Sequence, residues 1–291
     1  MSEDQHPSIR SRQVAGELRR LRKSAGLTTG EVGVRLGISQ SKVSRIENAK
    51  LGLTIEEVAA LLGLYQVPTQ RREQLLDLVR RAAEPGWVQV HSGNLPDQWQ
   101  TLIEWETRSI GLRDFGPLVI PGLLQTADYA RAIISASAPQ TRTEAELDTK
   151  VAARLGRQGI LSRAVPPQFH VILGEHALRM PVGSETVMGA QLRHLVEMAR
   201  RPNVTIQLVP LAAGPHPGLE GSFVLMDFEC DPSMVYVENK VQSIFIETPT
   251  VTPYALAWER MLDMALTPKR STDFLHRLIA GYEHNGAGRD S

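Results

Sequence analysis

The feature that most constrains the fold is a pair of short amphipathic segments separated by one glycine, within residues 27–50. Thr28 and Ser39 stand where the two segments begin, and both residue types are preferred helix N-caps because their hydroxyl oxygen accepts a free backbone amide. Gly37 stands between the segments and can adopt the left-handed backbone that a tight turn out of a helix requires. The sequence therefore predicts two short helices that meet at a tight turn.

Helical spacing of apolar residues continues on both sides of this pair. Residues 12–25, 54–62 and 68–83 repeat apolar side chains every three or four positions, which gathers them on one helical face. The Glu-Pro-Gly run at residues 84–86 then breaks the pattern. We therefore predict an all-α domain of five helices over residues 8–83.

Beyond this break, segments with the pattern of β-strands alternate with segments that have the apolar spacing of helices. The segments rich in β-branched residues and bounded by turn residues, which predict strands, are 168–173, 204–209, 222–228, 234–238 and 243–246. The segments with helical spacing are 97–114, 126–137, 143–161, 185–201, 252–266 and 272–284. The helix between the first two strands is typical of a βαβ unit. We predict a larger α+β domain over residues 84–284 and a disordered tail over residues 285–291.

Charge is distributed unequally between the two predicted domains. The chain as a whole is neutral, which on its own would argue against a nucleic-acid partner. Residues 8–83, however, carry 14 Lys and Arg against 7 Asp and Glu, a net charge of +7. Residues 84–291 carry 18 against 23, a net charge of −5. The positive field is thus confined to the small helical domain, as in a module that faces phosphate groups.

The second segment of the pair, residues 39–48, has the side chains of a helix that reads DNA. Its first turns carry hydroxyl, amide and cationic groups, while Val43 and Ile46 anchor the other face. Gln40 can bridge the two major-groove edge atoms of adenine and Arg45 those of guanine, although a phosphate contact is equally open for Arg45. The alternative is an ordinary helical hairpin with a solvated face. This composition inside the basic half of a neutral chain favours DNA recognition.

The run LGISQSKVSRIENAK, residues 36–50, resembles the helix-turn-helix of the Xre family, relatives of the phage Cro and repressor proteins. The resemblance covers residues 10–65 and implies a lambda-repressor-like fold. The residues that it places at the bases are Gln40, Ser41, Ser44 and Arg45, and those that it places near the DNA backbone are Thr29, Ser39, Lys42, Asn48 and Lys50. It also implies a structural ion pair between Arg22 and Glu47 that links the first and third helices.

This sequence departs from the Xre pattern at a few positions. Thr29 stands where the family usually has Gln, so this contact is in question. Gly30 and Gly33 are expected to weaken the second helix by up to ~1 kcal/mol each relative to alanine.

Three segments of the second domain form a recognisable set: FGPLVIPGLLQTADYARAI (115–133), QLRHLVEMARRPNVTIQ (191–207) and LEGSF (219–223). Together they resemble a domain found behind Xre-type modules in actinobacterial regulators of the WhiJ-like type. It covers most of residues 95–280. It implies an antitoxin-like, one-component regulator, often encoded beside a small partner protein.

Signatures of catalysis are weak in the second domain. Glu175 and His176 favour a helix N-cap over a pocket, and His216 between two prolines favours a rigid loop over a ligand. Cys230, flanked by two acids, is not expected to be a nucleophile. We therefore expect no catalytic residues, no metal site, no cofactor and no enzymatic activity.

The combined interpretation is a DNA-binding transcription regulator. No apolar run approaches the ~20 residues of a membrane span, and a single cysteine excludes an intramolecular disulfide, so we expect a cytoplasmic protein. We expect a homodimer on a palindromic double-stranded DNA site with half-sites about 34 Å apart. Two alternatives stay open for the second domain. One is an enzyme or small-molecule-binding protein with an accessory helix-turn-helix, and the other is a scaffold for oligomerisation only.

Overall fold

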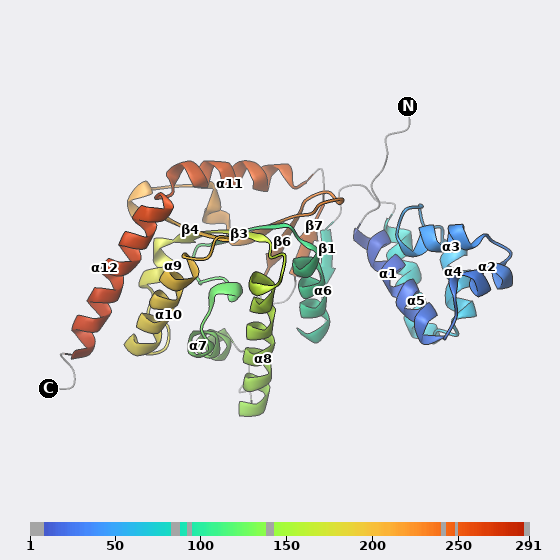
Figure 1. Ribbon diagram of the computed structural model, residues 1–291, viewed down its shortest axis with the longest axis horizontal. Coiled ribbons are helices and arrows are strands. Elements are labelled where there is room, and N and C mark those ends of the chain that lie inside the picture. Colours follow the sequence, from blue (N-terminus) through green and yellow to red (C-terminus); the bar gives the residue numbers. More distant parts are fainter. Residues whose placement is uncertain are drawn as a thin grey trace. The chain divides into compact units, whose positions relative to one another are not determined.

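The computed structural model describes residues 9–82, 88–91, 95–137, 143–239, 243–247 and 250–287. The chain divides into two compact units, residues 1–89 and 90–291. The domain boundary that we predict at residue 84 lies outside the described residues. Each unit has its own fold (Figure 1).

Within the described residues, the first unit has five helices, as predicted. They are α1 (Ile9–Ser24), α2 (Thr29–Leu36), α3 (Gln40–Glu47), α4 (Ile55–Leu64) and α5 (Thr69–Ala82). One apolar cluster joins them, because side chains from all five helices are buried in it. Val32 of α2 and Val43 and Ile46 of α3 are completely buried, which fixes the two short helices onto the core.

The turn between α2 and α3 has the caps that the sequence predicts. Thr28 and Glu31 form a capping box at the start of α2, with the Thr28 amide donating to the Glu31 carboxylate at 2.8 Å. Gly37 follows α2 with a left-handed φ of 68°. Ser39 then caps α3, where its hydroxyl oxygen accepts from the Lys42 amide at 3.1 Å.

Gly33 has a packing role that helix propensity alone does not reveal. A Cβ atom at this position would lie 2.7 Å from the carbonyl oxygen of Ile38 and 3.2 Å from the amide nitrogen of Gln40. Both are backbone atoms, so a side chain could not be accommodated by a change of rotamer. Besides its expected effect on helix propensity, Gly33 therefore has a packing role, because its missing side chain lets α2 approach the start of α3.

The second unit is built on a seven-stranded mixed sheet, counted over the described residues. The strands are β1 (Val88–His91), within which the division at residue 89 falls, β2 (Gly111–Gly116), β3 (Gln168–Gly174), β4 (Val204–Val209), β5 (Phe223–Asp227), β6 (Met234–Glu238) and β7 (Ser243–Ile246). Their order is β1-β7-β6-β5-β2-β3-β4. Strands β2, β3 and β4 are parallel, whereas β2–β5, β5–β6 and β6–β7 are antiparallel. This confirms the α+β class and the parallel pairing of the first two predicted strands.

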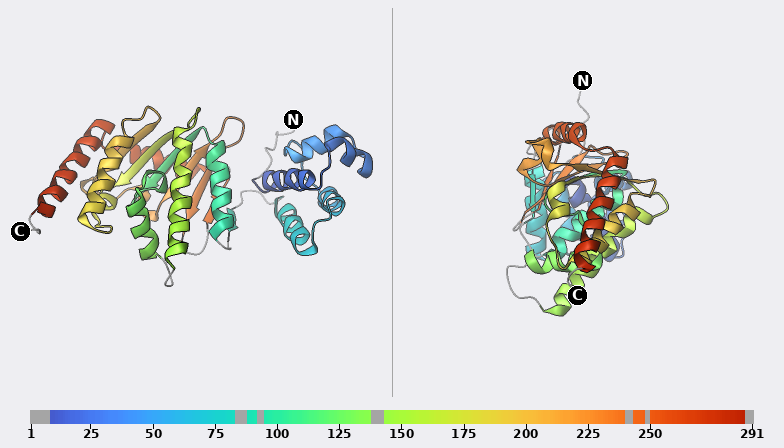
Figure 2. Two further views of the ribbon diagram at one scale, coloured as in Figure 1. Left: turned by 60° about the horizontal axis from the view of Figure 1, so that its bottom comes forward. Right: turned by 90° about the vertical axis from the view of Figure 1, so that its left-hand side faces the viewer.

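Helices cover both faces of this sheet. The helices are α6 (Leu95–Arg108), α7 (Ala127–Ser137), α8 (Glu144–Arg157), α9 (Glu175–Arg179), α10 (Glu185–Met198), α11 (Thr252–Met264) and α12 (Pro268–Ala287). Figures 1 and 2 show α6, α7, α8 and α10 on one face and α11 on the other. Helix α12 packs against α10 and β4 at one end of the sheet.

Three sequence predictions for this unit are wrong in part. The segment predicted as one helix over 97–114 ends its helix at Arg108, and residues 111–116 form the strand β2 in the middle of the sheet. The helix predicted over 143–161 becomes a 3-10 helix after Arg157. The tail predicted as disordered from residue 285 is helical to Ala287, and residues 288–291 lie outside the described part.

Sheet pairing explains why the helical spacing of residues 97–114 is misleading. The Ile110 amide donates to the Asp227 carbonyl at 2.9 Å, and β2 then pairs with β5 on one side and β3 on the other. Leu112 and Phe115 are buried between the covering helices. Long-range backbone pairing thus overrides a local pattern that fits a helix equally well.

We predict that Gly33→Ala destabilises the first unit, although alanine is the better helix former. The clash with backbone should cost about 1–3 kcal/mol, which exceeds the gain in helix propensity of about 1 kcal/mol. Hydrogen exchange of the α2–α3 segment in the full chain, followed by mass spectrometry, would report this as lost protection.

Gly30→Ala is the matched control for this variant. The Cβ atom at position 30 would meet no atom nearer than 3.9 Å, so protection should be unchanged or slightly increased. Equal protection in the two variants would contradict the packing role of Gly33.

Candidate nucleic-acid interface

Helix α3 presents one polar face and buries the other. Val43, Ile46 and Glu47 point into the unit and are at most 4% exposed. The residues on the outer side, spaced three or four positions apart so that they share one face, are Ser41, Ser44, Arg45 and Asn48. Arg45 is exposed and makes no side-chain hydrogen bond or ion pair with the described residues. Its guanidinium is therefore available to a partner outside the chain.

The first residues of α2 and α3 lie next to each other. The Gln40 side-chain amide donates to the Thr29 hydroxyl across a distance of 3.2 Å. Two of the predicted contact residues are thus brought together, and Thr29, the departure from the family pattern, orients Gln40. The contact shows that the N-terminal ends of α2 and α3 lie close together, and a helix N-terminus is a favourable place for a phosphate group.

The C-terminal end of α3 is capped by hydrogen bonds from residues at and just after its end. Asn48 donates through Nδ2 to the Ser44 carbonyl oxygen at 2.7 Å, and its Nδ2 lies 3.4 Å from the Ser44 hydroxyl. The Lys50 amide donates to the Arg45 carbonyl at 2.8 Å and completes the turn. Asn48 therefore has a capping role, whereas Lys50 is exposed beside it.

Lys42 forms an ion pair with Glu57, a residue that the sequence analysis does not single out. Its Nζ lies 2.6 Å from Oε1 of Glu57 in α4, and the two side chains are 39% and 23% exposed. The hydrogen bond from Lys42 holds the pKa of Glu57 below its ordinary value, so the pair persists at neutral pH. A phosphate group that binds Lys42 must compete with this carboxylate.

The ion pair expected between Arg22 and Glu47 is present and buried. Arg22 donates through Nε and Nη2 to the two Glu47 carboxylate oxygens at 2.7 and 2.9 Å, and through Nη1 to the Leu27 carbonyl at 2.7 Å. The two side chains are 11% and 2% exposed. Bidentate geometry of this kind is among the stronger polar contacts in proteins. It joins α1, the loop before α2 and the end of α3.

Tyr65 is a third member of this cluster that the sequence did not reveal. Its hydroxyl lies 3.5 Å from Oε1 of Glu47 and is oriented to donate to it. Burial, together with the Glu47 carboxylate, raises the pKa of Tyr65 above its ordinary value, so the hydroxyl stays protonated. The start of the turn after α4 is thereby held against α3.

The polar clusters noted in the second domain have structural roles in the described residues. The N-cap role expected for Glu175 and His176 is wrong, because the N-cap of α9 is Gly174 and no side chain caps it. The Glu175 carboxylate instead accepts from Arg179 and from the Leu211 amide. His216 accepts from the Gly218 amide at 3.2 Å and caps a 3-10 helix. Within the described part of the chain, no group of three His, Cys, Asp or Glu is placed to hold a metal ion. None of the helices described is long and apolar enough to span a membrane.

We predict that Glu47→Gln destabilises the first unit strongly, because it leaves the Arg22 charge buried without a counter-charge. The expected loss is about 3–5 kcal/mol, which would appear as loss of hydrogen-exchange protection in α1 and α3.

Glu17→Gln is the control, since it removes a carboxylate whose partners, Arg20 and Arg71, are 70% and 49% exposed and stay hydrated without it. That change should cost at most about 1 kcal/mol. Similar losses of stability for the two variants would show that the buried Arg22–Glu47 pair stabilises the first unit no more than the Glu17 contacts do.

Comparison with known protein families gives one match in each unit. A model described as a helix-turn-helix domain matches residues 13–75, which contain α2 and α3. A second model, described as a domain of unknown function (DUF5753), matches residues 99–277. No curated protein and no solved structure gives a match. Since the second match spans more than half of the 291 residues, the chain belongs to the family of proteins with a DUF5753 domain, here preceded by a helix-turn-helix domain that indicates a DNA-binding regulator.

Proposed function

We propose that this protein is a sequence-specific transcription regulator of the Xre type, which reads double-stranded DNA with α3. The observation that carries the proposal is the outer face of α3. There, Ser41, Ser44 and Arg45 are displayed on a helix whose opposite face is locked into the core. A rigid helix with short polar side chains fits the width of the major groove.

The mode of reading follows from the contacts around α3. Gln40 and Arg45 read adenine and guanine edges, with Ser41 and Ser44 beside them. Thr29, Ser39 and the amides at the two helix N-termini face the phosphates, together with Lys50 and, after its release from Glu57, Lys42. The net charge of +7 on residues 8–83 supports binding to a polyanion.

The second domain supplies assembly and regulation in this proposal. The protein binds as a homodimer to a palindromic site with half-sites about 34 Å apart. The α+β domain receives a small protein partner or a ligand, in the antitoxin-like manner that the WhiJ-like resemblance implies, and it has no enzymatic activity. Binding there shifts DNA affinity by a coupling of about 1–3 kcal/mol. The protein acts in the cytoplasm without a cofactor.

Arg45→Ala should relax specificity at one base position. We expect a loss of about 1–3 kcal/mol on the specific site and a much smaller loss on random DNA. Binding of the full chain to both DNAs, measured by fluorescence anisotropy at fixed salt, separates the two effects. Equal losses on both DNAs would place Arg45 on a phosphate and refute base reading by this residue.

Glu57→Gln should strengthen binding to all DNA sequences, because it frees Lys42 for a phosphate group. Exposed pairs of this kind are worth less than about 1 kcal/mol, so we expect roughly two- to fivefold tighter binding. The slope of affinity against salt should increase by about one further phosphate contact.

Glu56→Gln is the matched control, since it removes the same charge from an exposed neighbouring position on α4. It should change affinity and salt slope less than Glu57→Gln does. If the two variants behave alike, only net charge matters and Lys42 has no phosphate contact to make.

A further inference from the structure

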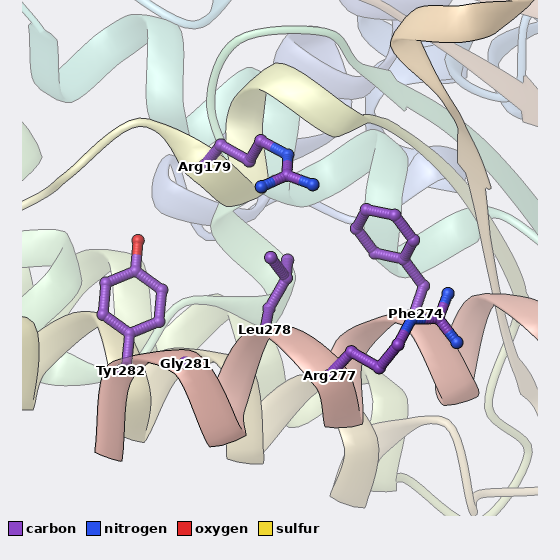
Figure 3. A pocket seen from close by; sticks show the side chains of 6 residues that line it. All are labelled: Arg179, Phe274, Arg277, Leu278, Gly281 and Tyr282. Atoms are coloured by element: carbon purple, nitrogen blue, oxygen red, sulfur yellow. The ribbon is translucent and has the colours of Figure 1, made fainter. Parts of the chain in front are cut away.

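A pocket of about 470 Å³ lies between α9 and α12 in the second unit. The residues that line it are Arg179, Phe274, Arg277, Leu278, Gly281 and Tyr282. Figure 3 shows Phe274, Leu278 and Tyr282 rising from α12 on the side that faces Arg179. The volume falls in the range of about 300–1,000 Å³ that is common for small-molecule sites.

Two cations border this pocket beside an aromatic ring. The guanidinium carbons of Arg179 and Arg277 lie 5.6 and 5.4 Å from the centre of the Phe274 ring. Arg179 donates through Nε to Glu175, and its two terminal nitrogens make no hydrogen bond to the described residues. Arg277 is exposed and makes no ion pair with them. Donors of two arginines are therefore free for an anionic group.

Gly281 forms an open part of the pocket wall that the fold itself does not require. It lies inside α12, where glycine costs about 1 kcal/mol relative to alanine. A Cβ atom there would meet no atom within 4 Å, and the backbone has no positive φ at this residue. Neither packing nor backbone geometry explains this glycine, and its missing side chain leaves the wall open between Leu278 and Tyr282 (Figure 3).

The neighbouring acids restrict the charge of a ligand. Glu175 is held by Arg179, and burial, followed by the Glu185 carboxylate, raises the pKa of Tyr282. Since Arg179 is paired with Glu175, the lining carries one uncompensated positive charge, that of Arg277, which suits a ligand with one negative charge. The aromatic rings of Phe274 and Tyr282 and the side chain of Leu278 suit a flat apolar body.

We propose that this pocket binds a small aromatic monoanion, with its carboxylate or sulfonate at Arg277 and Arg179 and its ring over Leu278 and Gly281. This inference rests on the proposed function in one respect, which is that the second domain receives a ligand. Occupancy can be measured without DNA, so failure of this site and failure of DNA recognition are distinguishable.

The test titrates the full chain with 8-anilinonaphthalene-1-sulfonate, an aromatic monosulfonate whose fluorescence rises in apolar sites. We expect saturable binding at one site, weakened about tenfold or more by Gly281→Leu, which fills the pocket. Gly156→Leu is the matched control, because Gly156 is also an exposed helical glycine with no atom within 4 Å of a Cβ, and it should leave binding unchanged.

The role of charge is tested with Arg277→Gln and with the neutral dye N-phenyl-1-naphthylamine. Arg277→Gln should weaken binding of the sulfonate about tenfold and leave the neutral dye unaffected. Equal binding of the sulfonate to wild type and Gly281→Leu would overturn the site, and equal loss of both dyes in Arg277→Gln would overturn the anion assignment. Binding of an acidic aromatic peptide in place of the dye would replace the small ligand with a protein partner and contradict the proposal.

Discussion

The buried ion pair between Arg22 and Glu47 is the contact on which the position of α3 depends. Two charges removed from water are stable only when each is fully compensated, and here the carboxylate accepts from Arg22 and Tyr65 while the guanidinium also holds the Leu27 carbonyl. The pair thereby fixes the distance of α3 from α1 and from the end of α4. An apolar contact of similar area could tolerate a shift of the helix, whereas this bidentate geometry does not.

A fixed α3 explains why short polar side chains suffice for recognition. Ser41 and Ser44 have little reach, so a hydroxyl can meet a base edge only if the helix axis is held in place. Gly33 contributes at the other end, because it permits close approach of α2 to the start of α3. Gln40 is oriented in turn by Thr29. Core packing, the close approach at Gly33 and the buried Arg22–Glu47 pair thus act together to hold the outer face of α3 in one position.

The first unit could be predicted from the sequence more completely than the second. Its helices carry local signals, such as the caps Thr28 and Ser39 and the turn glycine Gly37, which act within a few residues. The roles of Tyr65, Glu57 and Gly33 depend on neighbours distant in sequence or on backbone proximity, so no local pattern indicates them. The local pattern does not indicate strand β2 for the same reason, since this strand is defined by pairing with Gln168–Gly174 and Phe223–Asp227.

The most direct test of DNA recognition by α3 is selection of genomic DNA fragments by the full chain, followed by sequencing. The wild type is compared with a variant in which Gln40, Ser44 and Arg45 are alanine, and hydrogen exchange verifies that both are folded. Recognition by α3 predicts a palindromic motif with wild type and its loss in the variant. The same motif in both proteins, or no enrichment by folded wild type, would contradict sequence reading by this helix.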